Sequence, residues 1–158
     1  MAYRVFGEEM FTSHFSGTPV FYQKVIMPDY HAVLDGVKTS VIVYNNPSFT
    51  SLEMRLYSMK NNSLRQLIAT SEVKTKAEII TESNGIRNVP FVFSTRRTLY
   101  ANDYYGFVLW ANGYTGDGSS HIAWMKDFPD PVNPEGLTVS YDYLMKFPYR
   151  LALIGERR

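Results

Sequence analysis

Histidine side chains are the first candidates for catalytic chemistry in this sequence, because it contains no cysteine and therefore no thiolate nucleophile. The three are His14, His31 and His121, and no two of them have a metal-ligand spacing such as H-x-x-x-H. His121 follows Asp117 and two serines, which suggests a hydrolytic triad. A triad needs a nucleophile on a constrained turn and a base oriented by a buried acid. Neighbours in one glycine-containing loop do not meet that need, so the pattern favours a loop that leads into a strand.

Carboxylates in the C-terminal third are the next candidates: Asp103, Asp117, Asp127, Asp130, Glu135 and Asp142. A glycosidase needs two of them across a cleft, and sequence spacing alone does not place any two together. Residues 127–133 contain enough hard oxygen ligands for a calcium ion, but they lack the spacing of an EF-hand loop. Because Asp127 and Asp130 bracket Phe128-Pro129, we favour a proline-stiffened crossover without a metal. We expect no cofactor.

A polar loop separates the two tryptophans of the chain, Trp110 and Trp124. It contains Tyr114 and Asp117, and His121 follows it directly. Aromatic rings beside a polar loop are typical of a carbohydrate platform, because sugar faces stack on rings while hydroxyls bind carboxylates and amides. These five residues are therefore predicted as contacts to a glycan or a protein partner. Each tryptophan also alternates with an apolar neighbour, so core or protein–protein packing is the favoured alternative for both.

The elements that must position these side chains show a period of two residues. Leu52, Met54 and Leu56 alternate with Glu53 and Arg55, which is the pattern of a strand with one solvated face. Further strands are expected at residues 20–27, 37–44, 64–70, 77–81, 89–93, 104–111, 121–125 and 147–154. No segment shows a sustained 3.6-residue apolar period with caps at both ends. The pattern predicts an all-β fold, an antiparallel β-sandwich of about 8–10 strands.

One domain is expected from the length of 158 residues. The first 17 residues have no clear period, and we predict that residues 1–17 form an arm packed on the body or on a neighbouring subunit. Residues 18–158 would form the single sandwich domain. The candidate anchors of the arm are aromatic: Tyr3, Phe6, Phe11 and Phe15.

Four motifs follow one another along residues 37–125. They are LEMRLYS at 52–58, LIATS at 67–71, VPFVF at 89–93 and LYANDYYGFVL at 99–109. Their order resembles the jelly-roll modules of phage structural proteins and bacterial surface proteins, and residues 147–155 are similar to the closing strand of those modules. The resemblance implies a jelly-roll topology and carries no catalytic motif. One departure is the turn Ala101-Asn102-Asp103, where the family has a small glycine-containing turn. Asn or Asp can supply the left-handed conformation that glycine would otherwise provide.

Charge and hydropathy exclude several classes of partner. The net charge is +1 and no basic run is present, so we expect no nucleic acid partner. No apolar run approaches the roughly 20 residues of a membrane span, so we expect no membrane partner. The N-terminal residues lack the basic and apolar regions of a secretory signal, which predicts synthesis and folding in a host cytoplasm.

These features together predict a non-enzymatic structural component of a bacteriophage virion, such as a capsid decoration, tail or fibre-associated subunit. We expect it to reside in the virion, to form a homo-oligomer and to contact other virion proteins. One alternative is a carbohydrate-binding module that recognises host-surface glycans, and a module carried on a virion could serve both roles. A polysaccharide hydrolase is a second alternative, for which the sequence offers no motif.

Overall fold

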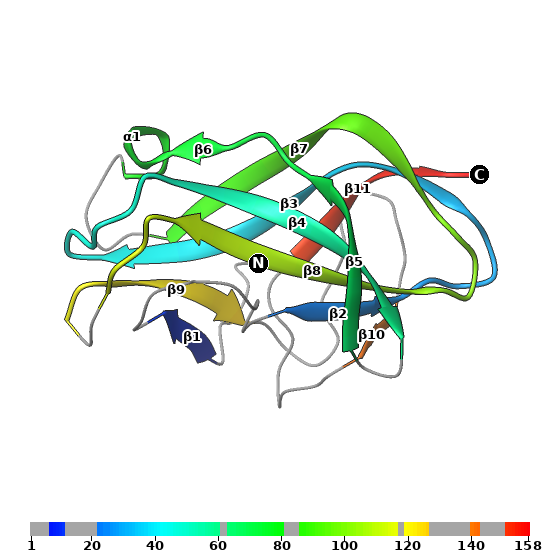
Figure 1. Cartoon of the computed structure of the whole chain (residues 1–158), viewed down its shortest axis with the longest axis horizontal. Coiled ribbons are helices and arrows are strands. Elements are labelled where there is room, and N and C mark those ends of the chain that lie inside the picture. Colours follow the sequence, from blue (N-terminus) through cyan, green and yellow to red (C-terminus); the bar gives the residue numbers. More distant parts are fainter. Residues whose placement is uncertain are drawn as a thin grey trace, which may run out of the picture.

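Two antiparallel sheets make up the fold in the computed structural model, which describes residues 7–11, 22–60, 63–80, 86–116, 119–126, 140–142 and 151–158 (Figure 1). In chain order the elements are β1 Gly7–Phe11, β2 Gln23–Ile26, β3 Ala32–Tyr44, β4 Ser51–Lys60, β5 Ser63–Thr70, β6 Lys74–Thr75, α1 Lys76–Ile79, β7 Ile86–Leu99, β8 Tyr104–Asn112, β9 His121–Lys126, β10 Ser140–Asp142 and β11 Leu151–Arg157. The predicted all-β antiparallel sandwich is confirmed.

The long strand β3 organises the first sheet. β7 pairs with β3 along one edge, and β9 and β11 share the other edge. β9 lies beside the C-terminal part of β3, where Trp124 is opposite Val41, and β11 lies beside the N-terminal part, where Leu151 is opposite Thr39. β1 then adds to the free edge of β9. The second sheet has the order β10-β2-β8-β4-β5, and the short β6 also pairs with β4.

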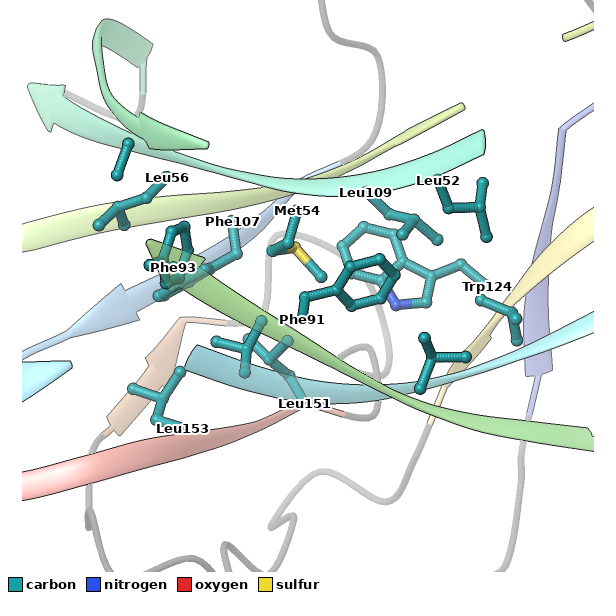
Figure 2. Close-up of a cluster of buried hydrophobic side chains, with 14 of the residues drawn as sticks. Leu52, Met54, Leu56, Phe91, Phe93, Phe107, Leu109, Trp124, Leu151 and Leu153 are labelled. Carbon is teal, nitrogen blue, oxygen red and sulfur yellow. The ribbon is translucent and has the colours of Figure 1, made fainter. Parts of the chain in front are cut away.

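A hydrophobic core lies between the two sheets. The alternation predicted in β4 is confirmed, because Leu52, Met54 and Leu56 have no exposed surface. Figure 2 shows these side chains and those of Phe107 and Leu109 from β8 directed towards the opposite sheet. The opposite sheet contributes Phe91, Phe93, Trp124, Leu151 and Leu153 to the same cluster. Burial of these side chains supplies the main driving force for folding.

The backbones of β3 and β7 lie unusually close next to a shift in their register. The register of β3 shifts between Leu34 and Gly36 against β7, and β11 shifts at the same level, between Ile154 and Gly155. A Cβ atom on Gly36 would lie 2.5 Å from the carbonyl oxygen of Phe91. Only glycine therefore fits at position 36 without moving the strands apart.

The short helix α1 replaces the strand expected at residues 77–81, whose last residue lies outside the described ranges. Thr75 caps it: the Thr75 hydroxyl accepts from the Glu78 amide at 3.3 Å, and the Glu78 carboxylate accepts from the Thr75 amide at 3.1 Å. This reciprocal pair is a capping box, and it favours a helical turn over an extended strand. The described part of the chain has no helix long and apolar enough to cross a membrane.

Part of the predicted N-terminal arm is a strand of the sandwich. β1 pairs with β9 along its whole length, with Phe11 opposite Ile122. Tyr3, Phe6 and Phe15 lie outside the described residues, as do residues 127–133 with their candidate calcium ligands. The closing strand β11 begins at Leu151, and the first residues of the strand expected at 147–154 also lie outside.

Candidate functional site

The residues predicted as glycan or partner contacts are mostly buried. Trp124 has no exposed surface, Tyr114 is 1% exposed, His121 is 4% exposed and Trp110 is 9% exposed. Asp117 lies outside the described residues. A sugar stacks only on a ring face that solvent can reach, so the burial of these four rings argues against a common contact surface.

Two of these rings belong to the core between the sheets. Trp124 points inward from β9, and its indole Nε1 donates a hydrogen bond to Thr39 Oγ1 at 2.8 Å. The Tyr114 hydroxyl accepts a hydrogen bond from the Ile122 amide at 3.1 Å, which ties the start of the β8–β9 loop to β9. The expected contact role does not fit Trp124 or Tyr114, because both rings are enclosed by protein. The core alternative describes Trp124 correctly.

Trp110 lies on the outer face of the second sheet, since its neighbours Leu109 and Ala111 point into the core. The guanidinium carbon of Arg55 is 4.0 Å from the ring centroid, a cation–π contact that occupies one ring face. Arg55 Nε also donates to Glu53 Oε2 at 3.0 Å, and Asn112 Nδ2 donates to Glu53 Oε1 at 2.7 Å. These bonds satisfy a carboxylate that is only 6% exposed. Trp110 is thus part of a polar network that stabilises β4 and β8.

His121 lies on the outer face of the first sheet, beside Tyr44, with 4.7 Å between the ring centroids. Trp110 and His121 are therefore on opposite outer faces, and the core with Trp124 and Tyr114 lies between them. The structure does not bring together the four predicted contact residues that it describes. Asp117, the acid of the triad suggested by the sequence, lies outside the described residues.

Exposed aromatic side chains gather at the other end of the sandwich. Tyr104 begins β8 and Trp110 lies six residues later, a separation of roughly 20 Å along a strand. The connection between β2 and β3 and the connection between β7 and β8 lie at this end, near the C-terminal end of β11, at the right of Figure 1. We call this region the tyrosine end and define it by Tyr30, His31, Tyr100, Tyr104 and Arg157.

Hydrogen bonds between the links hold the tyrosine end together. The Met27 amide donates to the Asp103 carbonyl at 2.9 Å, and the Asn102 amide donates to the Pro28 carbonyl at 2.8 Å. The Ala101 amide donates to His31 Nδ1 at 3.0 Å. Asn102 has a φ of 64°, so the left-handed conformation predicted for this turn is confirmed. These bonds fix one turn against another and leave the side chains of the turn residues to solvent.

The rings of the tyrosine end differ in what they contact. Tyr100 is 57% exposed and lies edge-on to His31, with 5.5 Å between centroids. Tyr104 is 42% exposed, and the Lys24 ammonium is 4.7 Å from its centroid. The Arg157 guanidinium carbon is 4.1 Å from the centroid of Tyr30. Three aromatic rings and two cations therefore share one end of the molecule.

Electrostatics around this end are set by burial and by exposed ion pairs. Burial raises the pKa of the Tyr105 hydroxyl, which also accepts the Tyr100 amide at 2.8 Å. On the first sheet, Arg96 pairs with Asp35 at 2.6 Å and with Glu156 at 3.4 Å. The hydrogen bond to Asp35 raises the pKa of Arg96. These pairs are exposed and add little stability, but they fix the charge pattern beside the tyrosine end.

Sequence analysis missed the tyrosine end for a physical reason. The motif LYANDYYGFVL contains Tyr100, Tyr104 and the turn between them, and that turn was predicted. The chain pattern carries no signal that residues 27–31 pack against this turn, because that contact depends on β2 pairing with β8. The sequence also gives no sign that His31 accepts a backbone hydrogen bond from this turn.

No group of three or more histidine, aspartate or glutamate side chains among the described residues could hold a metal ion. No protein-family model matches the sequence, and no relative is found among the curated proteins.

Proposed function

We propose that the sandwich is a jelly roll and that the protein is a non-enzymatic structural component of a bacteriophage virion, acting through protein–protein contacts. The strand pairing is the observation that carries this proposal. β4 pairs with β5, β3 with β7, β2 with β8 and β1 with β9, so each pair encloses the one before it along the chain.

Such nesting is what a single long hairpin produces when it is wrapped into two sheets. Its eight strands fall into the orders β1-β9-β3-β7 and β2-β8-β4-β5. Jelly rolls have eight strands in two Greek keys and occur in viral capsid proteins and lectins. This order agrees with the family resemblance of the motifs in residues 37–125 and is compatible with a virion role. Fold alone does not establish function, so a contact surface is needed as well.

The side of the sandwich where β5 and β7 meet offers such a surface. The Glu72 amide donates to the Val92 carbonyl at 2.8 Å, which places Glu72 opposite Val92, and Val73 is the next residue along the chain. Val73 is 52% exposed, Val92 is 43% exposed and Leu67 on β5 is 44% exposed. We infer that these exposed aliphatic side chains, which lie on or next to the two edge strands, take part in a protein contact. We call these three residues the β5–β7 side.

Open strand edges strengthen this assignment. Among the described residues, β5 pairs only with β4 and β7 only with β3, apart from the short bridge between Ser71 and Phe93. Unpaired backbone groups at a sheet edge are a template for another chain. Pro90 removes one donor from the β7 edge, so β5 is the edge better suited to pair with a neighbouring subunit.

The proposal is tested by measuring assembly. We expect the purified protein to form an oligomer in size-exclusion chromatography with light scattering, and Leu67→Ser with Val73→Ser to shift it towards monomer. The matched control is Tyr100→Ser, which changes a comparably exposed residue that is not part of the β5–β7 side and should leave the oligomer intact.

Mass spectrometry of purified phage particles from cells that carry the gene tests the virion assignment directly. We expect peptides of this chain to copurify with the capsid and tail proteins. A protein that stays monomeric at every concentration and is absent from such particles would overturn the proposal.

A further inference from the structure

We propose that the tyrosine end binds a carbohydrate chain, with the rings of Tyr100 and Tyr104 as its stacking surfaces. This site is separate from the β5–β7 side, and the inference does not depend on the proposed assembly role. It also differs from the contact set predicted around Trp110 and Trp124, whose rings are buried.

The two rings flank a short polar turn. Tyr100 and Tyr104 are 57% and 42% exposed, and Asn102 and Asp103 lie between them with exposed side chains. Sugars present an apolar C–H face and a rim of hydroxyls. An aromatic ring can stack on the apolar face. An amide can donate hydrogen bonds to the hydroxyls and accept from them, and a carboxylate can accept from them. The turn therefore supplies both kinds of contact within a few residues.

Each ring keeps a free surface. Lys24 lies over Tyr104 and is itself only 7% exposed, so the solvent-exposed part of the Tyr104 ring faces away from that ammonium. His31 meets Tyr100 at an interplanar angle of 79°, an edge-on contact that fixes the ring without stacking on it. Both rings are thus held from the protein side and open to solvent on the other.

The turn is fixed before any ligand arrives. Its backbone is bonded to the β2–β3 link through Asn102 and Ala101, and the Tyr100 amide donates to the Tyr105 hydroxyl in the protein interior. A rigid site loses little conformational entropy on binding, which matters for sugars because each individual contact is weak.

A protein partner fits this end less well. The centre of a protein interface is depleted in charged residues and buries about 800 Å² on each partner. Here Asp103 is exposed at the end of the turn, next to Tyr104, and Asp29 and Arg157 are also exposed. Two exposed rings with polar residues between them in the chain suit a saccharide better than they suit the broad apolar centre of a protein interface.

The test is binding of purified oligosaccharides on a glycan array, covering neutral hexose, N-acetylhexosamine and uronic acid chains, followed by calorimetric titration of the best binder. We expect binding by the unmodified protein and a loss of affinity of about three- to tenfold for Tyr100→Ala and for Tyr104→Ala, the range that corresponds to one lost aromatic contact. Arg65→Ala is the control, because Arg65 is exposed on the same sheet and belongs neither to the tyrosine end nor to the β5–β7 side.

Circular dichroism and thermal melting of each variant separate lost binding from lost folding. Asn102→Gly keeps the backbone conformation of the turn and removes the amide, and it should weaken binding without changing the melting temperature. The inference fails if no saccharide binds, or if affinity is the same in both tyrosine variants and the unmodified protein. It also fails if those variants lose a protein partner while a saccharide still binds normally.

Discussion

Trp124 and Thr39 form a buried hydrogen bond between neighbouring strands of the first sheet, with 2.8 Å between Nε1 and Oγ1. Thr39 is 1% exposed and Trp124 has no exposed surface. An indole N–H inside a core is costly unless it has an acceptor, and the β3 hydroxyl supplies one where an aliphatic residue could not. The bond therefore accounts for a polar residue at an inward-facing position of β3.

Thr39→Val tests the contribution of this bond, because valine has nearly the same shape and lacks the acceptor. We expect the free energy of unfolding to fall by about 1–3 kcal/mol, the usual effect of removing a partner from a buried donor. Urea unfolding followed by circular dichroism measures the change. A Thr39→Ser control keeps the hydroxyl, so it should lose less stability than Thr39→Val. No loss of stability in Thr39→Val would contradict the proposed role of the bond, because that variant keeps the shape of the side chain and removes only the acceptor.

Local sequence patterns correctly predicted features that depend only on residues close together in the chain, such as the core face of a strand. The alternation of Leu52, Met54 and Leu56 placed the core face of β4 correctly, because a pleated strand sends successive side chains to opposite faces. The same period assigned Glu53 to a solvated face, yet Glu53 is buried on the outer face by its bonds to Arg55 and Asn112. Periodicity gives the face of a residue and does not reveal whether that face is covered.

The helix α1 and the tyrosine end show two further reasons for missed predictions. Thr75 and Glu78 have the spacing of a capping box, but four residues are too short for a helical period to be visible. The tyrosine end joins residues near 30 to residues near 100, and such long-range proximity is set by strand pairing. Strand order cannot be derived from a single sequence when several antiparallel arrangements bury the same faces.

Alanine substitutions at Gly36 and Gly106 test how much an added Cβ atom costs where it would meet backbone and where it would meet a side chain. A Cβ at Gly36 would meet the Phe91 carbonyl oxygen at 2.5 Å, whereas a Cβ at Gly106 would meet the Leu64 Cδ2 atom at 2.3 Å. A leucine side chain can rotate, but a paired backbone cannot move without breaking ladder hydrogen bonds. We expect Gly36→Ala to lower the free energy of unfolding by about 2 kcal/mol or more, and Gly106→Ala by clearly less. Denaturant midpoints of the two variants measure the difference, and the opposite ranking would contradict the strand register at the bulge.

Because the Tyr105 hydroxyl is buried, we expect the protein to lose stability in alkaline solution. Burial raises the pKa of its hydroxyl above the ordinary value of 10.0, so the folded protein retains a proton that the unfolded chain releases first. Its contribution is therefore fully present below about pH 10 and is lost as the pH rises through the folded pKa. We expect Tyr105→Phe to be less stable than the unmodified protein at pH 7, because the Tyr100 amide loses its acceptor, and the difference to narrow above pH 10. Thermal melts from pH 7 to 11 would show this convergence, whereas parallel curves would contradict it.

His31 links the two turns of the tyrosine end, because its Nδ1 accepts from the Ala101 amide and its carbonyl accepts from the Arg158 amide. Substitution of His31 leaves the hydrogen bond to its backbone carbonyl in place, so the variants test the imidazole ring alone. In His31→Asn the Oδ1 atom can occupy nearly the position of Nδ1, while His31→Ala has no acceptor. We expect the Ala101 amide to exchange with deuterium faster in His31→Ala than in His31→Asn, with a stability loss of about 1 kcal/mol in the alanine variant. Exchange at the β9 amides serves as the internal reference and should not change. Identical exchange at Ala101 in both variants would mean that the turn is held by its backbone bonds to Pro28 and Met27, and that His31 acts only by orienting the Tyr100 ring.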